Sequence, residues 1–262
     1  MLPAARHQAI VDAVQRERVV RVSDLAHQLG VSLMTVRRDI ELLEEGGKLE
    51  RIHGGAKLPG DASTHEPGFE LKSTQLTAEK RAIALEAAAL VQQGMAVGLS
   101  AGTTTWALAK ELVNGPQITV VTNSVRIADL FHHAAATGSA RYSSTVILIG
   151  GQRTPSDALV GPIATAALKQ LHLDVLFLGV HGMDATAGFT TPNLLEAETN
   201  RAFVAAARKT VVLADHSKWG MLGISSIASL DEVDEVITDP GLGPEAQRVL
   251  REKVGKLRLA AA

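Results

Sequence analysis

Two arginines lie near the start of one predicted helix and three glutamates near its end, an order that suits contact with nucleic acid. The helix is predicted over 33–45, after Ser32 as its N-cap and before the Gly46-Gly47 pair. Helices normally carry acids in the first turn and bases in the last, so Arg37 and Arg38 break a local rule, as functional residues often do. Arginines at this place in a helix can reach base edges and phosphates in a major groove.

The apolar residues of this helix predict which of its faces is buried. They recur at spacings of 3, 4 and 3, so they form one stripe made of Leu33, Val36, Ile40 and Leu43. At about 100° per residue, Thr35 and Arg38 then point away from the stripe and Arg37 lies on its flank. The alternative is that both arginines are solvated surface charges, paired with Glu41, and carry no function.

Two predicted helices before this one and a predicted hairpin after it would position the arginines. Apolar spacing predicts a helix over about 4–16, and Ser23 is the expected N-cap of a second helix over 24–29. Helix, Gly-containing turn and helix is the helix-turn-helix pattern. The stretch KLERIHGGAKL alternates apolar and charged residues, which predicts a hairpin with His53 near its turn. That hairpin is either a wing that contacts DNA or an ordinary turn, and the pattern leaves both open.

The rest of the chain alternates apolar, β-branched runs with helical patterns. The runs cover 95–99, 118–122, 145–149, 174–179, 210–214 and 236–238, and the helical patterns 104–112, 124–132, 162–171 and 194–208. Such alternation predicts an α/β fold with a parallel sheet covered on both faces. We therefore expect a winged helix-turn-helix domain over 1–57, a Pro- and Gly-containing linker over 58–76, and an α/β domain over 77–262.

Small, polar or charged residues follow five of the predicted strands. In a parallel sheet these strand ends meet at one edge, where ligands bind. Gly102, followed by three threonines at the start of a helix, offers backbone N–H groups, hydroxyls and the positive helix end to an anion. Lys218 and Arg153 can add full charge, while Asn123, Asp184 and Asp215 can bond to sugar hydroxyls. This mixture predicts a site for a phosphorylated sugar or polyol; the alternatives are a plain helix cap and a surface lysine.

Composition limits the chemistry further. Lys plus Arg total 26 and Asp plus Glu 28, a net charge of −2, which excludes a chain whose whole surface binds phosphate. Cysteine is absent, which excludes disulfides, thiolate nucleophiles and Cys-ligated metals. No pair of histidines has the i, i+4 spacing of helical metal ligands, so we expect no metal and no cofactor. The sequence shows no apolar run of 18 residues and no signal-peptide pattern, so we expect no membrane association and a cytoplasmic location.

The first segment closely resembles the winged helix-turn-helix of the DeoR family of bacterial regulators of sugar metabolism. The hallmark Ser-x-x-Thr-(Val/Ile)-Arg-Arg-Asp-(Leu/Ile) is present over 32–40, and Arg-x-His-Gly-Gly-Ala over 51–56. The resemblance implies that the residues that contact DNA are Ser32, Thr35, Arg37, Arg38 and His53.

The second segment resembles the effector domain of the same family, which is related in fold to ribose-phosphate isomerases and glucosamine-phosphate deaminases. The shared stretches are LSAGTTT (99–105), VVTNS (120–124), IGGQ (149–152), LVGPIA (159–164), LGVHGMD (178–184) and LADHSKWG (213–220). The resemblance implies a phosphate site at 102–105 and Lys218. The effector-binding residues expected from loops and resemblance together are Ser100, Gly102, Thr103, Thr104, Thr105, Thr122, Asn123, Gly151, Arg153, His181, Asp184 and Lys218.

One departure from the related deaminases argues against catalysis. They follow the loop aspartate with Gly-His, whereas Asp184 is followed here by Ala185-Thr186, so the acid–base group is missing. We therefore expect a sensor and not an enzyme. The candidates for residual catalysis are His181, His216, Glu196 and Glu198.

The residues and the resemblance together imply a repressor of a carbohydrate-utilisation operon that a phosphorylated sugar releases from its operator. Repression, as opposed to activation, is implied by the resemblance alone. One recognition helix contacts only about 3–6 base pairs, so we expect a homodimer or homotetramer that presents two or more heads. Two alternatives remain at this point. One is a sugar-phosphate isomerase or deaminase with a DNA-binding appendage, and the other is a DNA-binding protein whose second domain only oligomerises.

Overall fold

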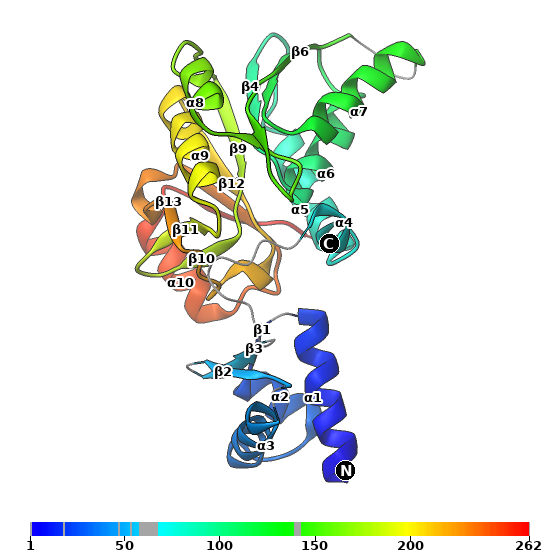
Figure 1. The fold of residues 1–262 in the computed structure, drawn as a ribbon, viewed down its shortest axis with the longest axis vertical. Helices are drawn as coiled ribbons and strands as arrows, with labels where there is room; N and C mark the ends of the chain where they lie inside the picture. The colour runs from blue at the N-terminus through cyan, green and yellow to red at the C-terminus, as the bar shows by residue number, and fades with distance from the viewer. Residues whose placement is uncertain are drawn as a thin grey trace. The chain divides into compact units, whose positions relative to one another are not determined.

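The computed structural model describes residues 2–17, 19–46, 48–52, 54–57, 68–138 and 143–261. Two compact units make up the chain, Met1–His65 and Glu66–Ala262. Within the described residues, no helix is long and apolar enough to span a membrane. Each unit encloses its own apolar core, and Figure 1 shows the fold of both.

The N-terminal unit is a three-helix domain with a small antiparallel sheet. Its elements are α1 (Pro3–Glu17), β1 (Val19–Arg21), α2 (Val22–Leu29), α3 (Leu33–Glu45), β2 (Glu50–Ile52) and β3 (Gly55–Lys57). The sheet has the order β1-β3-β2, so the predicted hairpin is present and a strand that the sequence analysis missed completes it. Because β1 leads directly into α2, the helix begins at Val22. Ser23 is therefore not its N-cap, and the Ser23 hydroxyl bonds to Asp24 instead.

Helix α3 confirms the predicted cap and corrects the predicted stripe. The Ser32 hydroxyl accepts a hydrogen bond from the Thr35 amide at 3.1 Å, and Val36, Ile40 and Leu43 are buried. Leu33 in the first turn is 50% exposed, because the core cluster that α3 joins begins only at Val36. The other buried residue of α3 is polar: Asp39, whose carboxylate bonds to Arg6 and His7 of α1.

The C-terminal unit is built on a seven-stranded sheet in which every neighbouring pair is parallel, as predicted. The order is β15 (Leu257–Leu259), β14 (Glu235–Thr238), β12 (Thr210–Leu213), β9 (Val175–Gly179), β4 (Ala96–Leu99), β5 (Thr119–Thr122) and β6 (Thr145–Leu148). Strand β15 is the one strand of this sheet that the sequence analysis missed. The strand ends that carry the predicted site residues therefore lie at a common edge.

Helices cover both faces of this sheet (Figure 1). On one face, α5 (Thr77–Ala88), α6 (Thr103–Leu112) and α7 (Val125–Ala136) share a buried cluster with β4 and β5. On the other, α8 (Pro162–Leu168), α9 (Leu194–Ala206) and α10 (Pro244–Lys253) share a second cluster with β9 and β12. Both clusters are mainly aliphatic, which agrees with the low aromatic content of the sequence.

Smaller elements that the sequence analysis did not predict lie around the main sheet. They are α4 (Phe69–Ser73), the hairpin of β7 (Gln152–Arg153) and β8 (Leu159–Val160), the three-stranded antiparallel sheet of β10 (Gly182–Asp184), β11 (Gly188–Thr191) and β13 (Ser225–Ala228), and the short helices η1 (His216–Lys218) and η2 (Leu230–Glu232). Helix α4 falls inside the stretch that we interpreted as a linker. It packs on the C-terminal unit, because the Phe69 ring contacts Trp106 edge-on with centroids 5.6 Å apart.

Candidate functional site

The outward face of α3 carries arginines that no carboxylate neutralises. Arg37 and Arg38 are exposed and have no ion pair with any residue that the structure describes. The alternative pairing with Glu41 is wrong, because Glu41 bonds to the guanidinium of Arg51 on β2 at 2.7 Å. Glu44 accepts a hydrogen bond from the Arg51 backbone amide at 2.9 Å. The acids at the end of α3 thus hold the hairpin, while the arginines at its start stay available to a ligand.

Helix α3 and the hairpin together line a shallow concave surface. Its residues include Met34, Arg37, Arg38, Arg51 and Gly54. Ser32 and Thr35 lie at the start of α3, where their hydroxyls are 2.9 Å apart. His53 lies outside the described residues, so its predicted contact with DNA stays a prediction. Arg51 also lines this surface but was not among the predicted DNA-contacting residues, although it is the first residue of the Arg-x-His-Gly-Gly-Ala motif.

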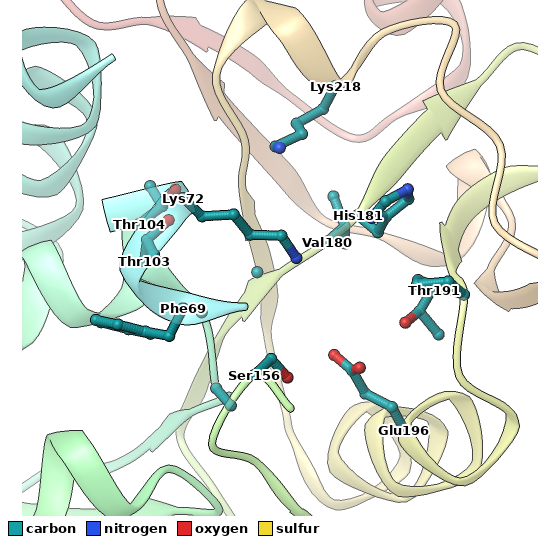
Figure 2. Close-up of a pocket in the computed structure, with 14 residues that line it drawn as sticks. Phe69, Lys72, Thr103, Thr104, Ser156, Val180, His181, Thr191, Glu196 and Lys218 are labelled. Carbon is teal, nitrogen blue, oxygen red and sulfur yellow. The ribbon is translucent and has the colours of Figure 1, made fainter. Parts of the chain in front are cut away.

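A cleft that is partly open to solvent lies at the carboxyl edge of the parallel sheet. Gly102, Thr103 and Thr104 reach it from the start of α6, His181 from the end of β9, and Lys218 from η1. Five of the twelve predicted effector-binding residues therefore meet at one place. Figure 2 shows that segments far apart in the sequence supply the walls of this cleft.

The start of α6 is shaped for close approach of a ligand to the backbone. Gly102 has φ +154°, and a Cβ atom there would lie 3.2 Å from the Thr105 hydroxyl and 3.8 Å from the Gly179 Cα. A side chain at this position would thus be strained and crowded. The first amides of α6 have no partner within their own helix, so the helix start offers donors and a positive dipole end to the cleft.

Four more of the predicted residues stabilise the loops around the cleft from beneath, and none lines it. Asn123 accepts a hydrogen bond from the Ala101 amide at 2.9 Å and donates one to the Leu159 carbonyl at 3.1 Å. The buried Ser100 hydroxyl accepts a hydrogen bond from the Gly179 amide at the end of β9, and the buried hydroxyls of Thr105 and Thr122 donate to the carbonyls of Gly102 and Leu99. These side chains have no spare exposed surface with which to contact a ligand.

The last three predicted residues take part in local turns outside the cleft lining. Gly151 and Arg153 enter the β7–β8 hairpin, and the Arg153 guanidinium pairs with Asp157 at 2.7 Å. Asp184 accepts hydrogen bonds from the amides of residues 186 and 187, so it closes a tight turn between β10 and β11. The expectation that strand ends share one edge placed these residues near the correct edge. In the hairpins that follow the strands, however, the side chains of Arg153 and Asp184 bond to groups of their own hairpins and do not face the cleft.

Several cleft residues were not among the predicted effector ligands. Phe69 and Lys72 come from α4, and the others are Ala101, Ser156, Gly179, Val180, Thr191, Pro192 and Glu196. In Figure 2 the Lys72 ammonium extends into the cleft from α4, Lys218 lies across it, and the Glu196 carboxylate points in from α9. Glu196 had been considered only as a residue for residual catalysis. Nothing in the sequence near Lys72 has a helical or strand period, so no signal separated it from a linker lysine.

Two of the candidates for residual catalysis are placed elsewhere. Glu198 is exposed on α9 and does not line the cleft. His216 bonds through Nδ1 to Asp239 at 2.7 Å, and this hydrogen bond raises the pKa of the His216 imidazole. Asp239 also accepts a hydrogen bond from the His216 backbone amide, so the His216–Asp239 pair anchors η1, the element that carries Lys218.

A third lysine lies behind the cleft. Lys80 is buried, and its ammonium donates to the carbonyls of Lys72 at 2.6 Å and Gln75 at 2.7 Å, so it holds the carboxyl end of α4. The pKa of Lys80 is lowered to about 8, mainly by burial; the charges of Lys218 and Lys72 contribute to this lowering, and the charge of Asp215 opposes it. Among the described residues, the cleft lining thus combines two ammonium groups and a helix start with one carboxylate, that of Glu196, while Lys80 lies behind it.

Comparisons with known proteins agree with both regions. Residues 6–61 match the model of the DeoR-like helix-turn-helix domain, and residues 75–240 match that of the DeoR C terminal sensor domain. The regulator GlpR of Haloferax volcanii is 38% identical over 248 residues, 94% of each chain, and the glycerol-3-phosphate regulon repressor of Escherichia coli is 30% identical over 260 residues, 99% of this chain and 100% of its own. Among solved structures, ribose 5-phosphate isomerase A of Methanocaldococcus jannaschii is 20% identical over 53% of each chain, with a TM-score of 0.37.

These two relatives are named as a regulator and a repressor, and each matches this chain over nearly its whole length. They confirm the expectation of a regulator and not an enzyme. The two family models cover the arginine surface of α3 and the cleft residues from the sheet-edge loops, whereas Phe69 and Lys72 of α4 lie between the matched ranges. The chain belongs to the DeoR family of helix-turn-helix transcriptional regulators.

Proposed function

We propose that this protein is a repressor of a carbohydrate-utilisation operon and that a phosphorylated sugar or polyol in the C-terminal cleft releases it from its operator. The single observation that carries the proposal is the convergence of Lys72, Lys218 and the start of α6 on one cleft, with Glu196 on its far side. The cationic side suits a phosphate, and a carboxylate accepts hydrogen bonds from sugar hydroxyls.

The DNA-binding part of the proposal is supported by the outward arginines of α3. Arg37, Arg38 and Arg51 line one concave surface, and Arg37 and Arg38 have no ion pair among the described residues. Arginine is suited to this role because its planar guanidinium can bond to two acceptors of a guanine or a phosphate at once. We assign Ser32, Thr35, Arg37 and Arg38 to operator contact, with His53 as a further contact from the hairpin.

We further propose that the protein acts as a homodimer or homotetramer. One recognition helix specifies too few base pairs for an operator, so two heads on one assembly are needed. The edge strand β6 supports a subunit contact, because Ile147 and Leu148 are 37% and 43% exposed there. Light scattering should give two or four times the chain mass of 27.6 kDa; a monomeric mass at micromolar concentration would contradict this.

The domain boundaries follow from the same argument. We propose that residues 1–57 bind DNA and that the sensor includes α4, because Phe69 and Lys72 line its cleft. The segment that connects the two is then shorter than the 58–76 expected from composition.

A ligand screen by thermal shift tests the proposal. The full chain is heated with inorganic phosphate and with glucose 6-phosphate, fructose 1-phosphate and glycerol 3-phosphate, each of these three esters beside its unphosphorylated parent. A phosphorylated ligand at about 100 times its Kd should stabilise the wild-type protein by about 2.7 kcal/mol. The unphosphorylated parents should have no effect.

Two variants locate the binding. Lys218→Ala should abolish the shift, whereas Lys169→Ala, an exposed lysine that does not line the cleft, should retain it. A shift that survives Lys218→Ala unchanged would place the ligand elsewhere. Absence of any shift across the phosphorylated panel would instead favour a C-terminal domain that only oligomerises.

A further inference from the structure

Arg126 of α7 touches two separate segments that form walls of the cleft, although it does not itself line the cleft. Its Nη2 bonds to Glu70 of α4 at 2.7 Å, and its Nε bonds to Asp157 in the β7–β8 hairpin at 2.5 Å. Its guanidinium also lies 4.2 Å from the centroid of the Phe69 ring. One side chain therefore connects α4 to the hairpin by two ion pairs and a cation–π contact.

Each connected segment contributes residues to the cleft. Phe69 and Lys72 extend from α4, and Ser156 comes from the tip of the hairpin, next to Asp157. In Figure 2, Ser156 and Phe69 lie on the same side of the cleft, and Lys72 extends above them. A change in the position of Arg126 would thus displace both walls together.

The tip of the hairpin is held in an unfavourable backbone conformation. Asp157 has φ +64°, in the left-handed region that residues other than glycine seldom adopt. Its carboxylate bonds to both Arg126 and Arg153. Burial alone would raise the pKa of Asp157, but these hydrogen bonds lower it below its usual range. The two arginines therefore help to keep the tip in this conformation.

Helix α4 depends on such contacts for its order. It has five residues, far fewer than an isolated helix needs to be stable in water. Its anchors are Arg126, the edge-on contact of Phe69 with Trp106, and the Lys80 bonds to its last carbonyls. It is also the first described element after β3, the last strand of the N-terminal unit, from which residues 58–68 separate it.

We propose that Arg126 is a positioning residue that latches α4 to the β7–β8 hairpin, so that ligand occupancy of the cleft and docking of α4 stabilise each other. This inference rests on the proposed function of the cleft. A ligand that contacts Lys72 gains that contact only when α4 is docked, so binding shifts α4 toward the docked state, and docking raises affinity by the same factor. The segment that leads to the DNA-binding unit is thereby sensitive to the ligand.

The latch is tested first without ligand, by amide hydrogen exchange of the full chain. Arg126→Gln should raise exchange about tenfold in both 69–75 and 152–160, because charge-assisted hydrogen bonds to each are lost. Asp157→Asn keeps a residue that tolerates left-handed φ but removes the charge. It should also raise exchange in α4, although none of the Asp157 hydrogen bonds goes to α4. Arg248→Gln, which breaks an exposed ion pair on α10, is the matched control and should change neither segment.

A milder variant covers the case in which Arg126→Gln fails to fold. Glu70 is 80% exposed, so Glu70→Gln leaves the core intact and should still raise exchange in α4. An effect of Asp157→Asn confined to 152–160, or no effect of Arg126→Gln on either segment, would overturn the latch, because the two walls would then move independently.

The second arm measures affinity by calorimetry with inorganic phosphate and glucose 6-phosphate. For whichever of these anions binds the wild type, Arg126→Gln should lower the affinity about tenfold. Arg248→Gln should leave the affinity unchanged. Equal affinity in Arg126→Gln and wild type would overturn the coupling. If wild type binds neither anion, the proposed function fails for both probes, and the exchange arm still decides whether Arg126 joins the two walls.

Discussion

The two functional regions of this protein acquire their charge in opposite ways. Arg37 and Arg38 are consecutive residues of α3, and the nearby acids Glu41 and Glu44 bind Arg51 of the hairpin. In the C-terminal cleft, the cations Lys72 and Lys218 are 146 positions apart and meet only because the sheet brings their segments together. A surface for a long, regular ligand needs one rigid element, whereas a cleft that encloses a small ligand needs several.

The largest effect should come from the buried carboxylate that supports the DNA-binding surface. Asp39→Ala removes the partner of Arg6 and His7 between α1 and α3 and should destabilise the N-terminal unit by about 2–3 kcal/mol. Operator binding should fall with it, while binding of the phosphorylated ligand should not change. Chemical denaturation and calorimetry of the same variant measure both. A loss of ligand affinity would show that the two regions do not fold independently.

Acid should reproduce part of this effect in the wild type. The hydrogen bond from Arg6 lowers the pKa of Asp39 in the folded state. Its contribution to stability is therefore complete above about pH 4, the ordinary range of an aspartate, and is lost as the pH falls through the lower folded value. Denaturation of the Asp39→Ala variant should depend less on pH below 4 than that of the wild type.

The next largest effect concerns the outward arginines. Arg38→Ala should weaken operator binding by about 1–3 kcal/mol if the guanidinium contacts a base, or lower the salt slope by about one if it contacts a phosphate. Fluorescence anisotropy at several salt concentrations separates the two. Arg248→Ala, in the exposed pair on α10, is the control and should leave the binding curve unchanged. An unchanged curve for Arg38→Ala would disprove the recognition-helix assignment.

Lys72 tests whether the cleft needs a residue from α4. Lys72→Met keeps the length of the side chain but removes its charge, so affinity for the phosphorylated ligand should fall about tenfold. Calorimetry measures the affinity of Lys72→Met, of wild type and of the control Lys169→Met, which should bind as tightly as wild type. If Lys72→Met binds as tightly as wild type, the ligand contacts only the sheet-edge loops, and the cleft is more local than we propose.

The smallest effect should be a pH dependence of ligand affinity. The Lys80 pKa is about 8, so this lysine is mostly charged at pH 7 and mostly neutral at pH 9. A phosphate monoester is already doubly ionised across this range, so its affinity should fall about two- to threefold as the positive charge near Lys72 and Lys218 is lost. Lys80→Gln keeps hydrogen-bond donors without the titration and should flatten the profile. A wild-type profile that is already flat would mean that Lys80 does not affect the ligand.

Periodicity and turn residues predicted most of the fold. Six strands of the parallel sheet, the three N-terminal helices and the hairpin all follow from patterns of a few residues, because burial of one face imposes a period and burial of both faces imposes a continuous apolar run. Helix α5 has 12 residues and was also not predicted; most of its buried residues are alanines, which mark an apolar face weakly. The shorter elements that were missed have a common cause. Strand β1, strand β15 and helix α4 span three to five residues, too few to show a period, and they form because a preformed neighbour stabilises them.

The candidate cleft was predicted less completely than the fold. The strand-end rule found Gly102, Thr103, Thr104, His181 and Lys218, since strand ends share one edge whatever the side chains do. It could not tell that Asn123 turns inward to the Ala101 amide or that Arg153 pairs with Asp157. The direction of a loop side chain depends on which partner lies within reach, and that partner is usually distant in the sequence.

The two-part organisation, most of the strands and helices, and the placement of Arg37 and Arg38 on the open face of α3 follow from the sequence alone. These features are local, because hydrophobic period and capping act within a few residues. In contrast, the shared cleft of Lys72, Glu196 and Lys218 and the link that Arg126 makes between α4 and the hairpin are visible only in the folded structure. Ion pairs and hydrogen bonds form between groups that are close in space. Groups that are distant in the sequence come that close only when the cores have packed.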